Sequence, residues 1–441
     1  MKRLNTILIA ACRAIIASAF WVATRISKDV KVSGLQHDRG AARTYLAMSH
    51  KRDLDPIVAV PTIVFHRGWH ALADDVHFAL RGDAFSPGYL ARMVMRPRWL
   101  SYLLRFLSVG PALRWLGIFP ADSLLLPIEE WVREAIRVVG DRQVGDVFIP
   151  SLIEELVAAC PASRESYEHM ISQPVSRLLA WKYQGVVQHV YGPEILVGAV
   201  RRPVQQRVVA RIKKHLAEVD AWLWRRGSLY ASAEGQLSPL GLLSQVSGGF
   251  HRIMRTAPPE TSVVPFFLIY DFMSTQRLRI FIDLAAPVER APMLSTAELD
   301  AQLRVKWLSA ARFTCTQLGS GFLAQASYAS LSSFTLDDMV KSIHIQAKSL
   351  TEAGRHVDQR LLTIQGARKR ARGFLAYAAR HGLVQRGAHN TWKPTINETP
   401  LTLRPGEVGY NRAPLTYALN ELHEMLNATW TALVSSPSRF T

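Results

Sequence analysis

The segment that most constrains this chain is residues 45–56, an apolar run that ends in a histidine, with an aspartate and a proline behind it. Histidine is the side chain most easily tuned to take up a proton near pH 7. Asp55 lies five positions after His50, and a carboxylate held against one ring nitrogen leaves the other nitrogen free to act as a base. Pro56 suits the first turn of a helix. The segment therefore predicts a buried strand, a turn with a histidine–aspartate pair, and a helix.

The spacing of this pair does not by itself separate chemistry from chance, because a loop histidine beside a solvated acid has the same pattern. The surrounding segments strengthen the interpretation that this pair is catalytic. Residues 30–34 alternate as a strand and turn, and residues 228–232 form a strand that leads into a loop with Glu234 and Gly235. Residues 262–270 read as a further strand with a proline near its start. Together these segments predict strands whose ends carry polar loops.

In this arrangement the chain resembles the glycerolipid acyltransferase family, the group of glycerol-phosphate and lysophosphatidate acyltransferases. The first sequence block of that family is similar to residues 49–55, the third to residues 233–235 and the fourth to residues 263–266. Residues 81–90 are similar to the family's connecting segment. The resemblance covers about residues 29–290 in matching order, with one large interruption.

The resemblance implies an α/β fold in which a mixed central sheet is flanked by helices. It also implies an O-acyltransferase of phospholipid biosynthesis. Such an enzyme moves a fatty acyl group from acyl-CoA or an acyl carrier protein to a hydroxyl of a glycerol-phosphate or lysophospholipid-type acceptor. His50 would be the general base of this HX4D motif, worth about 10²–10⁴ in rate, and Asp55 would orient its ring. We expect direct attack, without an acyl-enzyme.

The resemblance also assigns binding roles. The loop after residue 232 would bind the acceptor, and the strand that contains Pro265 would line the acyl pocket. The basic residues next to His50 would contribute to substrate binding. The predicted substrate-binding residues are Lys51, Arg52, Glu234, Gly235, Val264 and Pro265.

The chain departs from the family where a phosphate would be held. The second block normally supplies an arginine, but the matching positions here are Ala121 and Asp122. The third block normally continues with a threonine–arginine pair, which is replaced by Gln236 and Leu237. Either other basic residues replace these arginines, or the acceptor carries no phosphate at this place.

The interruption, about residues 126–225, has apolar positions at helical spacing and predicts a helical insertion in an acyltransferase domain of residues 29–300. It contains basic clusters such as Arg201 and Arg202, which could replace the missing arginines. A solvated helix face explains such clusters equally well. A lid over the site or a second membrane-facing surface is the functional alternative.

Residues 1–28 predict a membrane-associating helix. The apolar run is nearly long enough to span a bilayer, but Arg13 lies in its middle, and a central arginine costs about 2.5–3.5 kcal/mol on insertion scales. A helix in the membrane interface, with Arg13 reaching the phosphates, avoids that cost. A cleaved signal peptide and a packed soluble helix are the alternatives. We expect a membrane-associated protein at the cytoplasmic face.

Residues 301–441 predict a separate, mainly helical region with a winged-helix-like order of helix, strand and wing. Its basic run at residues 365–372 and the formal charge of +18 would attract polyanions, including anionic membrane surfaces. Bound DNA needs a recognition helix, base-reading side chains and a phosphate footprint together, and only the footprint is visible in the sequence. We therefore expect a structural cap and no nucleic-acid partner.

The remaining motifs are weak. The three cysteines lie far apart without metal-type spacing and favour a reducing compartment. His66 and His70 have the i, i+4 spacing of a metal pair, with His77 near, but solvated or packed histidines explain them better. We expect no metal and no cofactor. A catalytically altered relative that only binds lipid or membrane is the main alternative function, ahead of a nucleic-acid-binding protein.

Overall fold

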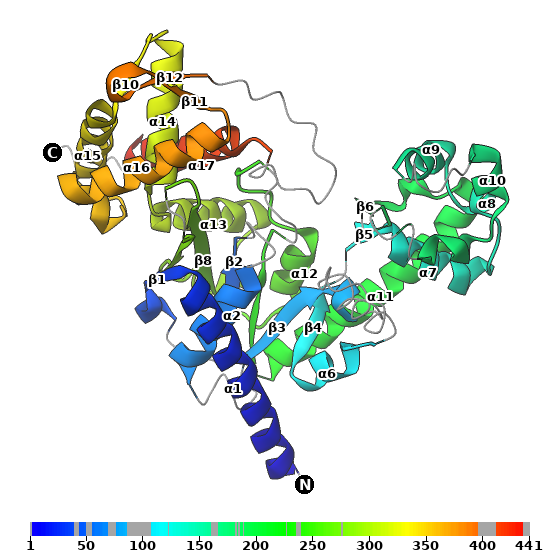
Figure 1. Ribbon diagram of the computed structural model, residues 1–441. Coiled ribbons are helices and arrows are strands. Elements are labelled where there is room, and N and C mark those ends of the chain that lie inside the picture. Colours follow the sequence, from blue (N-terminus) through cyan, green and yellow to red (C-terminus); the bar gives the residue numbers. More distant parts are fainter. Residues whose placement is uncertain are drawn as a thin grey trace. The chain divides into compact units, whose positions relative to one another are not determined.

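The computed structural model describes residues 2–38, 44–49, 55–68, 76–85, 107–121, 123–159, 166–180, 183, 186–187, 189–225, 227–234, 240–274, 277–395 and 412–434. In this part the protein is α/β, with a seven-strand mixed sheet and many helices, which confirms the predicted class at that level (Figure 1). The chain forms two compact units. The first contains Met1–Val76, Leu223–Leu403 and Glu407–Thr441, and the second contains His77–Trp222 and Arg404–Gly406.

The strands of the mixed sheet have the order β1-β9-β8-β2-β7-β3-β4. Most neighbours are parallel, and β9 runs antiparallel to β8. Their bounds are β1 Asp29–Ser33, β2 Thr44–Met48, β3 Val76–Arg81, β4 Ile118–Ala121, β7 Ser228–Ser232, β8 Ser262–Asp271 and β9 Arg279–Leu284. The strands predicted at residues 30–34, 44–49, 228–232 and 262–270 are therefore confirmed.

Strand β2 lies between two parallel neighbours, β7 and β8. All five of its residues are buried, as expected for a strand of a parallel sheet that is covered on both faces. Ala47 is aligned with Ala231 of β7 and with Pro265 of β8. Because these strands are parallel, the segments that follow β2 and β7 leave the sheet at one edge, which we call the carboxyl edge.

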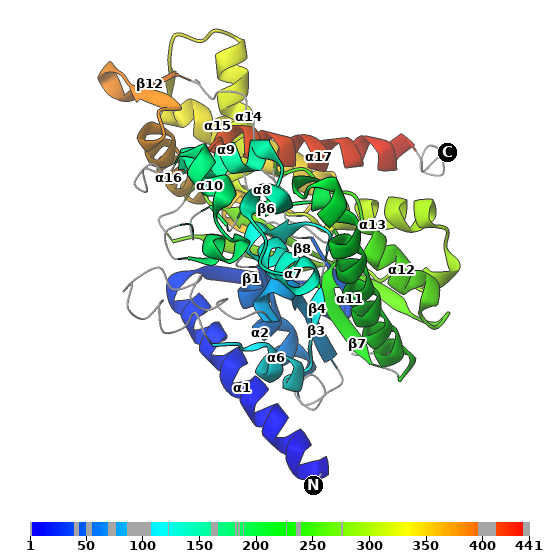
Figure 2. The same cartoon turned by 90° about the vertical axis from the view of Figure 1, so that its right-hand side faces the viewer.

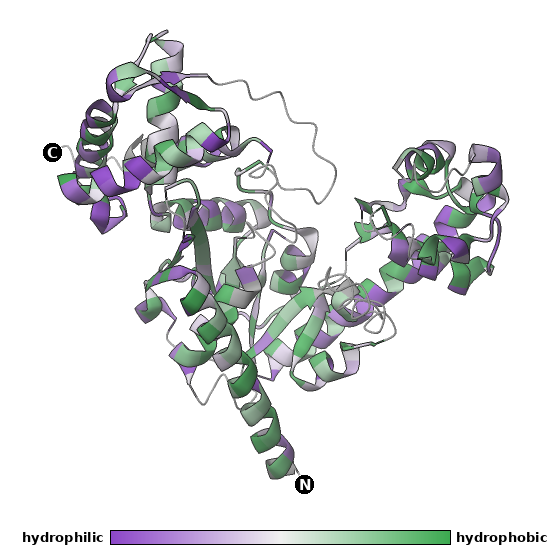
Figure 3. Ribbon diagram, viewed as in Figure 1, coloured by the Kyte–Doolittle hydropathy of each residue, from purple (hydrophilic) through white to green (hydrophobic). Residues whose placement is uncertain are grey.

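Helix α1 (Lys2–Ser27) packs on α2 (Asp55–Arg67) with a face that includes Ile9, Ala17 and Arg13. Arg13 is only 6% exposed, so the expectation that it reaches lipid phosphates is wrong. Its turn of the helix faces the protein, and the face left outside is apolar (Figure 3). The large exposed apolar residues of α1 are Leu4, Ile7, Leu8, Ile15, Ile16, Phe20, Trp21, Val22 and Ile26.

The helices on the C-terminal side of the sheet begin at capping boxes. Ser295 and Glu298 cap α13, Thr314 and Gln317 cap α14, and Thr335 pairs with Asp338 at the start of α15. The bounds in this region are α12 Gly248–Thr256, α13 Thr296–Ala310, α14 Cys315–Tyr328, β10 Phe334–Thr335, α15 Leu336–Glu352, α16 Ile364–Arg380, β11 Val384–Arg386, β12 Thr391–Pro394 and α17 Pro414–Val434.

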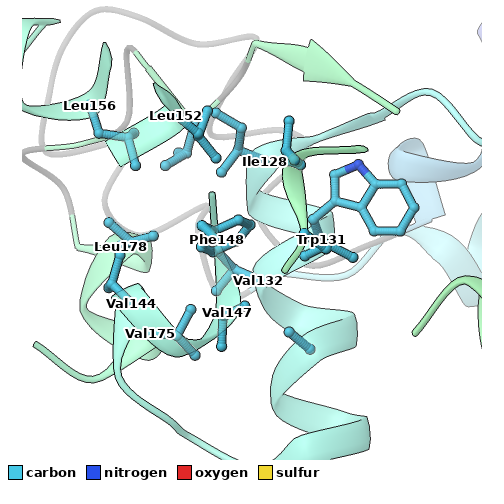
Figure 4. Close-up of a cluster of buried hydrophobic side chains, with 14 of the residues drawn as sticks. Ile128, Trp131, Val132, Val144, Val147, Phe148, Leu152, Leu156, Val175 and Leu178 are labelled. Carbon is cyan, nitrogen blue, oxygen red and sulfur yellow. The ribbon is translucent and has the colours of Figure 1, made fainter. Parts of the chain in front are cut away.

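The second unit contains a helical subdomain with its own apolar core (Figure 4). Trp131, Phe148 and Leu156 are fully buried there, and the indole N–H of Trp131 donates to the Tyr191 carbonyl at 2.9 Å. Besides β4, the α-helices and strands of residues 110–224 are α6 Gly110–Trp115, β5 Leu126–Pro127, α7 Ile128–Val139, α8 Val144–Val147, α9 Pro150–Ala159, α10 Tyr167–Ser172, β6 Val190–Tyr191 and α11 Gly198–Trp224. Residues 126–225 are thus largely helical where described.

Candidate functional site

The predicted site falls partly inside the described residues. Its members there are Asp55, Glu234, Val264 and Pro265. His50, Lys51, Arg52 and Gly235 lie outside the described residues, as do Asp122, Gln236 and Leu237. The site is therefore built from the residues that flank His50 and from those that surround Asp55.

Ser49, the residue before His50, is fixed against β8. Its backbone N–H donates to the Phe266 carbonyl at 2.9 Å, and its Oγ accepts from the Leu268 N–H at 3.4 Å. Ser49 is fully buried. The chain thus continues the β2–β8 ladder up to the position directly before His50, at the carboxyl edge of the sheet.

Asp55 is the first residue of α2 and is fully buried, at 0% exposure. The hydroxyl of Tyr270, near the end of β8, donates to Asp55 Oδ1. The amino terminus of a helix also stabilises a negative charge. Burial, and the nearby charge of Asp55, raise the pKa of Tyr230 well above its usual value. Asp55 is therefore a buried acid between two tyrosines, held by one of them.

The far end of α2 is also fixed. Arg67 donates from Nε to Asp38 Oδ2 at 2.8 Å, and its Nη2 pairs with Asp38 Oδ1. Both side chains are buried, and a two-point arginine–carboxylate contact sets orientation as well as energy. Since α2 is held at Asp55 and at Arg67, the position of the Asp55 carboxylate is well determined by its surroundings.

Glu234 lies at the same edge, two residues after β7. It is 3% exposed and accepts from the Ser244 N–H at 2.6 Å. The preceding residue, Ala233, donates its N–H to the Met48 carbonyl at 3.3 Å. Ser49 and Glu234 thus follow the adjacent parallel strands β2 and β7 at this edge, and Asp55, at the start of α2, is held there by Tyr270 of β8.

Val264 and Pro265 do not belong to this edge, because they lie further back in β8, opposite Leu46 and Ala47. Both are buried. The Pro265 carbonyl accepts from Ala285 N at 2.9 Å, directly after β9 ends, and a proline has no N–H with which to continue that ladder. Their role in lining an acyl pocket stays a prediction.

Arg201, proposed to replace the missing phosphate-binding arginines, forms hydrogen bonds within the protein. Arg201 donates from Nη2 to the carbonyls of Glu194 and Leu196, at 2.8 and 2.9 Å. These bonds tie the start of α11 to the turn before it. Arg202 is exposed. At the second block, Ala121 ends β4 and is exposed.

Tyr270 is the functional candidate that the sequence analysis missed. A signal for it was present: β8 runs parallel to β2, so a polar side chain at its end falls at the carboxyl edge. A second histidine–aspartate pair was also missed. His251 Nε2 of α12 lies 3.1 Å from Asp300 Oδ1 of α13. Those residues are far apart in sequence, and no spacing pattern joins them.

The histidines considered for metal binding have other neighbours where they are described. His66 Nε2 lies 3.0 Å from the Asp38 carbonyl, and the His77 ring stacks on Trp222 with ring centres 3.6 Å apart. His70 lies outside the described residues. Within the described ranges, no three His, Cys, Asp or Glu residues are grouped as a metal site would require.

The carboxyl edge therefore combines a buried carboxylate, a tyrosine that donates to it, and a second buried acid near the strand end that precedes His50. A carboxylate held in this way can fix the orientation and tautomer of an imidazole, which can then remove a proton from a hydroxyl. No family model matches the chain, and no curated protein matches it.

Proposed function

We propose that this protein is an O-acyltransferase of the glycerolipid type, with His50 as its general base. The acyl group moves from acyl-CoA or an acyl carrier protein to a hydroxyl of a glycerol-phosphate or lysophospholipid-type acceptor. The observation that carries the proposal is Asp55, fully buried at the start of α2 and held by Tyr270. A buried ionisable group is expensive, and such groups concentrate at functional sites.

In the proposed reaction His50 takes the proton from the acceptor hydroxyl while the oxygen attacks the thioester carbonyl. The thiolate leaves and is protonated, so a free thiol and an acyl ester are formed. Asp55 positions the ring and stabilises the imidazolium. Tyr270 positions Asp55 in turn. Glu234 lies at the same edge, as an acceptor-binding role for it and Gly235 requires.

The acceptor is less defined than the reaction. The usual arginines are absent at the second and third blocks, and Arg201 is bonded to backbone carbonyls of its own unit. Lys51 and Arg52, next to the proposed base, are the cations closest in sequence to the reacting group. An acceptor with a phosphate and one without it are therefore the informative pair of substrates.

The first experiment follows thiol release from a long-chain acyl-CoA with acceptors that do or do not carry a phosphate. We expect acceptor-dependent release that His50→Ala reduces by at least about 10²-fold, the lower end of general-base effects. His251→Ala is the matched control, because His251 also pairs with an aspartate. Loss of activity in the control but not in His50→Ala would indicate that the catalytic site lies at α12. Absence of thiol release with both acyl-CoA and an acyl carrier protein as donors would refute the proposed enzyme activity.

We also propose that α1 holds the protein at a membrane surface on its cytoplasmic face. By length and composition, α1 is the one helix in the described ranges that could cross a membrane. Its outer face is apolar, whereas Arg13 faces the protein. Trp21 packs edge-on against the exposed Phe65 of α2, with ring centres 6.2 Å apart, which widens the apolar surface. A helix lying in the interface uses such a surface.

The membrane test is co-sedimentation with vesicles that contain anionic lipid. Ile15→Glu with Phe20→Glu should weaken binding at least about 100-fold, because each exposed apolar side chain adds roughly 1.5–3 kcal/mol when buried. Glu substitutions at Ser309 of α13 and Ser349 of α15, two exposed polar residues away from α1, are the charge-matched control. Equal binding by both variants would refute the interface helix. Binding without any thiol release would favour the lipid-binding alternative.

A further inference from the structure

The C-terminal part of the first unit has the element order of a winged helix. Its chain passes through α14, β10, α15, α16, β11 and β12 in that order. The three strands form a separate antiparallel sheet with the order β10-β12-β11. In this arrangement β11 and β12 form a hairpin beside α16, which occupies the place of a recognition helix.

Helix α16 has an inward face that joins it to the rest of the first unit. Ala371 and Phe374 are fully buried, and the ring of Tyr377 packs against Phe272, which follows β8, with ring centres 6.3 Å apart. The preceding turn is fixed by an ion pair between Asp358 and Arg279 of β9. This face packs against the first unit, and it uses one side of α16 only.

The outward face of α16 is basic. Lys369, Arg372 and Arg380 are exposed, together with Gln365. Arg368 is half-exposed and its Nη2 lies 2.9 Å from Asp337 Oδ1 of α15. The helix contains no Asp or Glu. The exposed charged residues of α16 are therefore all cations, and they extend from its first turns to its last residue.

The hairpin after α16 extends this surface. Arg386 and Lys393 are exposed, and Arg386 Nη2 donates to Asn390 Oδ1 at 2.9 Å. The tip is a tight turn in which His389 and Asn390 have positive φ, 53° and 57°. Residues 334–395 contain eleven Lys and Arg against four Asp and Glu. We call Gln365, Arg368, Lys369, Arg372, Arg380, Arg386 and Lys393 the α16 surface.

We propose that the α16 surface binds double-stranded DNA, with α16 in the major groove and the hairpin against the adjacent phosphates. The major groove is about 12 Å wide and admits one helix, and lysines and arginines that line a helix and its flanks neutralise phosphates. Gln365 and the arginines of the first turns can bond base edges. The sequence shows the cations alone; the structure adds the exposed helix and hairpin that carry them.

A lipid surface fits the α16 surface less well than a duplex does. Apart from Ile364 at the first turn of α16, no large apolar residue is exposed along α16 or the β11–β12 hairpin. The amino-terminal half of α1, which has the apolar face, projects at the opposite end of the first unit from β12 in both views (Figures 1 and 2). This inference does not depend on the proposed acyl transfer.

The test is fluorescence anisotropy of a labelled 20-base-pair duplex titrated with the full chain at several salt concentrations. We expect saturable binding with Kd of about 10⁻⁴–10⁻⁶ M at physiological salt, or tighter for a preferred sequence. Lys369→Gln with Arg372→Gln should weaken binding about tenfold and reduce the slope of log K against log salt by about 2. Both side chains are exposed, so the fold should be retained.

The charge-matched control is Arg255→Gln with Arg290→Gln, two exposed arginines outside this region. It should bind DNA as the unchanged protein does. Absence of saturable binding at 50 mM salt would overturn the proposal, and so would an equal effect of the two double variants. The proposal is also overturned if the α16 variant lowers binding to anionic vesicles or to an acidic carrier protein while DNA binding stays the same.

Discussion

The helical subdomain of the second unit and the carboxyl edge of the first unit bury different kinds of side chain. The core of the subdomain surrounds Trp131 and Phe148 with apolar side chains, among them Tyr183 and Met170. The carboxyl edge instead buries Asp55, Glu234 and Asp271, each with hydrogen-bond donors around it. Apolar packing alone is sufficient to hold a fold of this size.

The free-energy cost of burying polar groups explains why this difference between the two regions matters. A buried acid loses its hydration, and its hydrogen bonds return only part of that free energy. In the second unit, arginines offset this cost for the buried acids Glu130 and Glu134. At the carboxyl edge, hydroxyl and backbone N–H groups donate to the buried acids instead. The contrast assigns packing to the subdomain and places the candidate chemistry at the carboxyl edge. Substitutions in each region should therefore affect different properties.

The largest expected effect is in the apolar core. Phe148→Ala removes a fully buried ring and should lower the free energy of unfolding of the second unit by about 3–5 kcal/mol. Denaturant unfolding followed by hydrogen exchange of α7 and α9 would measure it. Phe148→Leu is the control and should cost much less, because most of the volume is kept. A loss under about 1 kcal/mol would mean that this core is not tightly packed.

A smaller effect is expected at the carboxyl edge. Tyr270→Phe removes the hydroxyl that donates to Asp55 and should cost about 1.5–3 kcal/mol, typical of a hydrogen bond to a charged group. It should also change the pH dependence of acyl transfer, since Asp55 positions the proposed base. The matched control is Tyr230→Phe. It removes a hydroxyl that in the unchanged protein donates to Met48 Sδ, a weak acceptor. Equal pH profiles for the two variants would refute the positioning role of Tyr270.

The smallest expected effect concerns Asp271. Burial raises the pKa of this carboxyl, although Ser274 and Thr316 donate to it. An acid with a raised pKa binds its proton more tightly in the folded state, so its contribution to stability falls as pH increases above about 4, the pKa of an unfolded aspartate. In Asp271→Asn this decline should be absent. Unfolding measured from pH 4 to pH 7 tests the difference in slope; parallel curves would contradict it.

Elements with local signals were predictable from the sequence, and features that depend on tertiary contacts were not. The buried run of β2 and the helix start at Pro56 follow from short patterns, and both are confirmed. Tyr270 was missed because its partner is 215 positions away in the sequence. The orientation of Arg13 was predicted wrongly, since hydropathy along α1 does not reveal which face α2 covers.

The inward orientation of Arg13 has a consequence for how the protein would be distributed in a cell. An arginine that packs against α2 lets α1 stay folded on its own protein when no lipid is present. Attachment through one such helix is then a reversible partition, governed by mass action and not by a single insertion event. The membrane-bound fraction of the protein would depend on the area and the charge of the available membrane. Lipid composition itself would then set how much of the protein reaches its proposed acceptor.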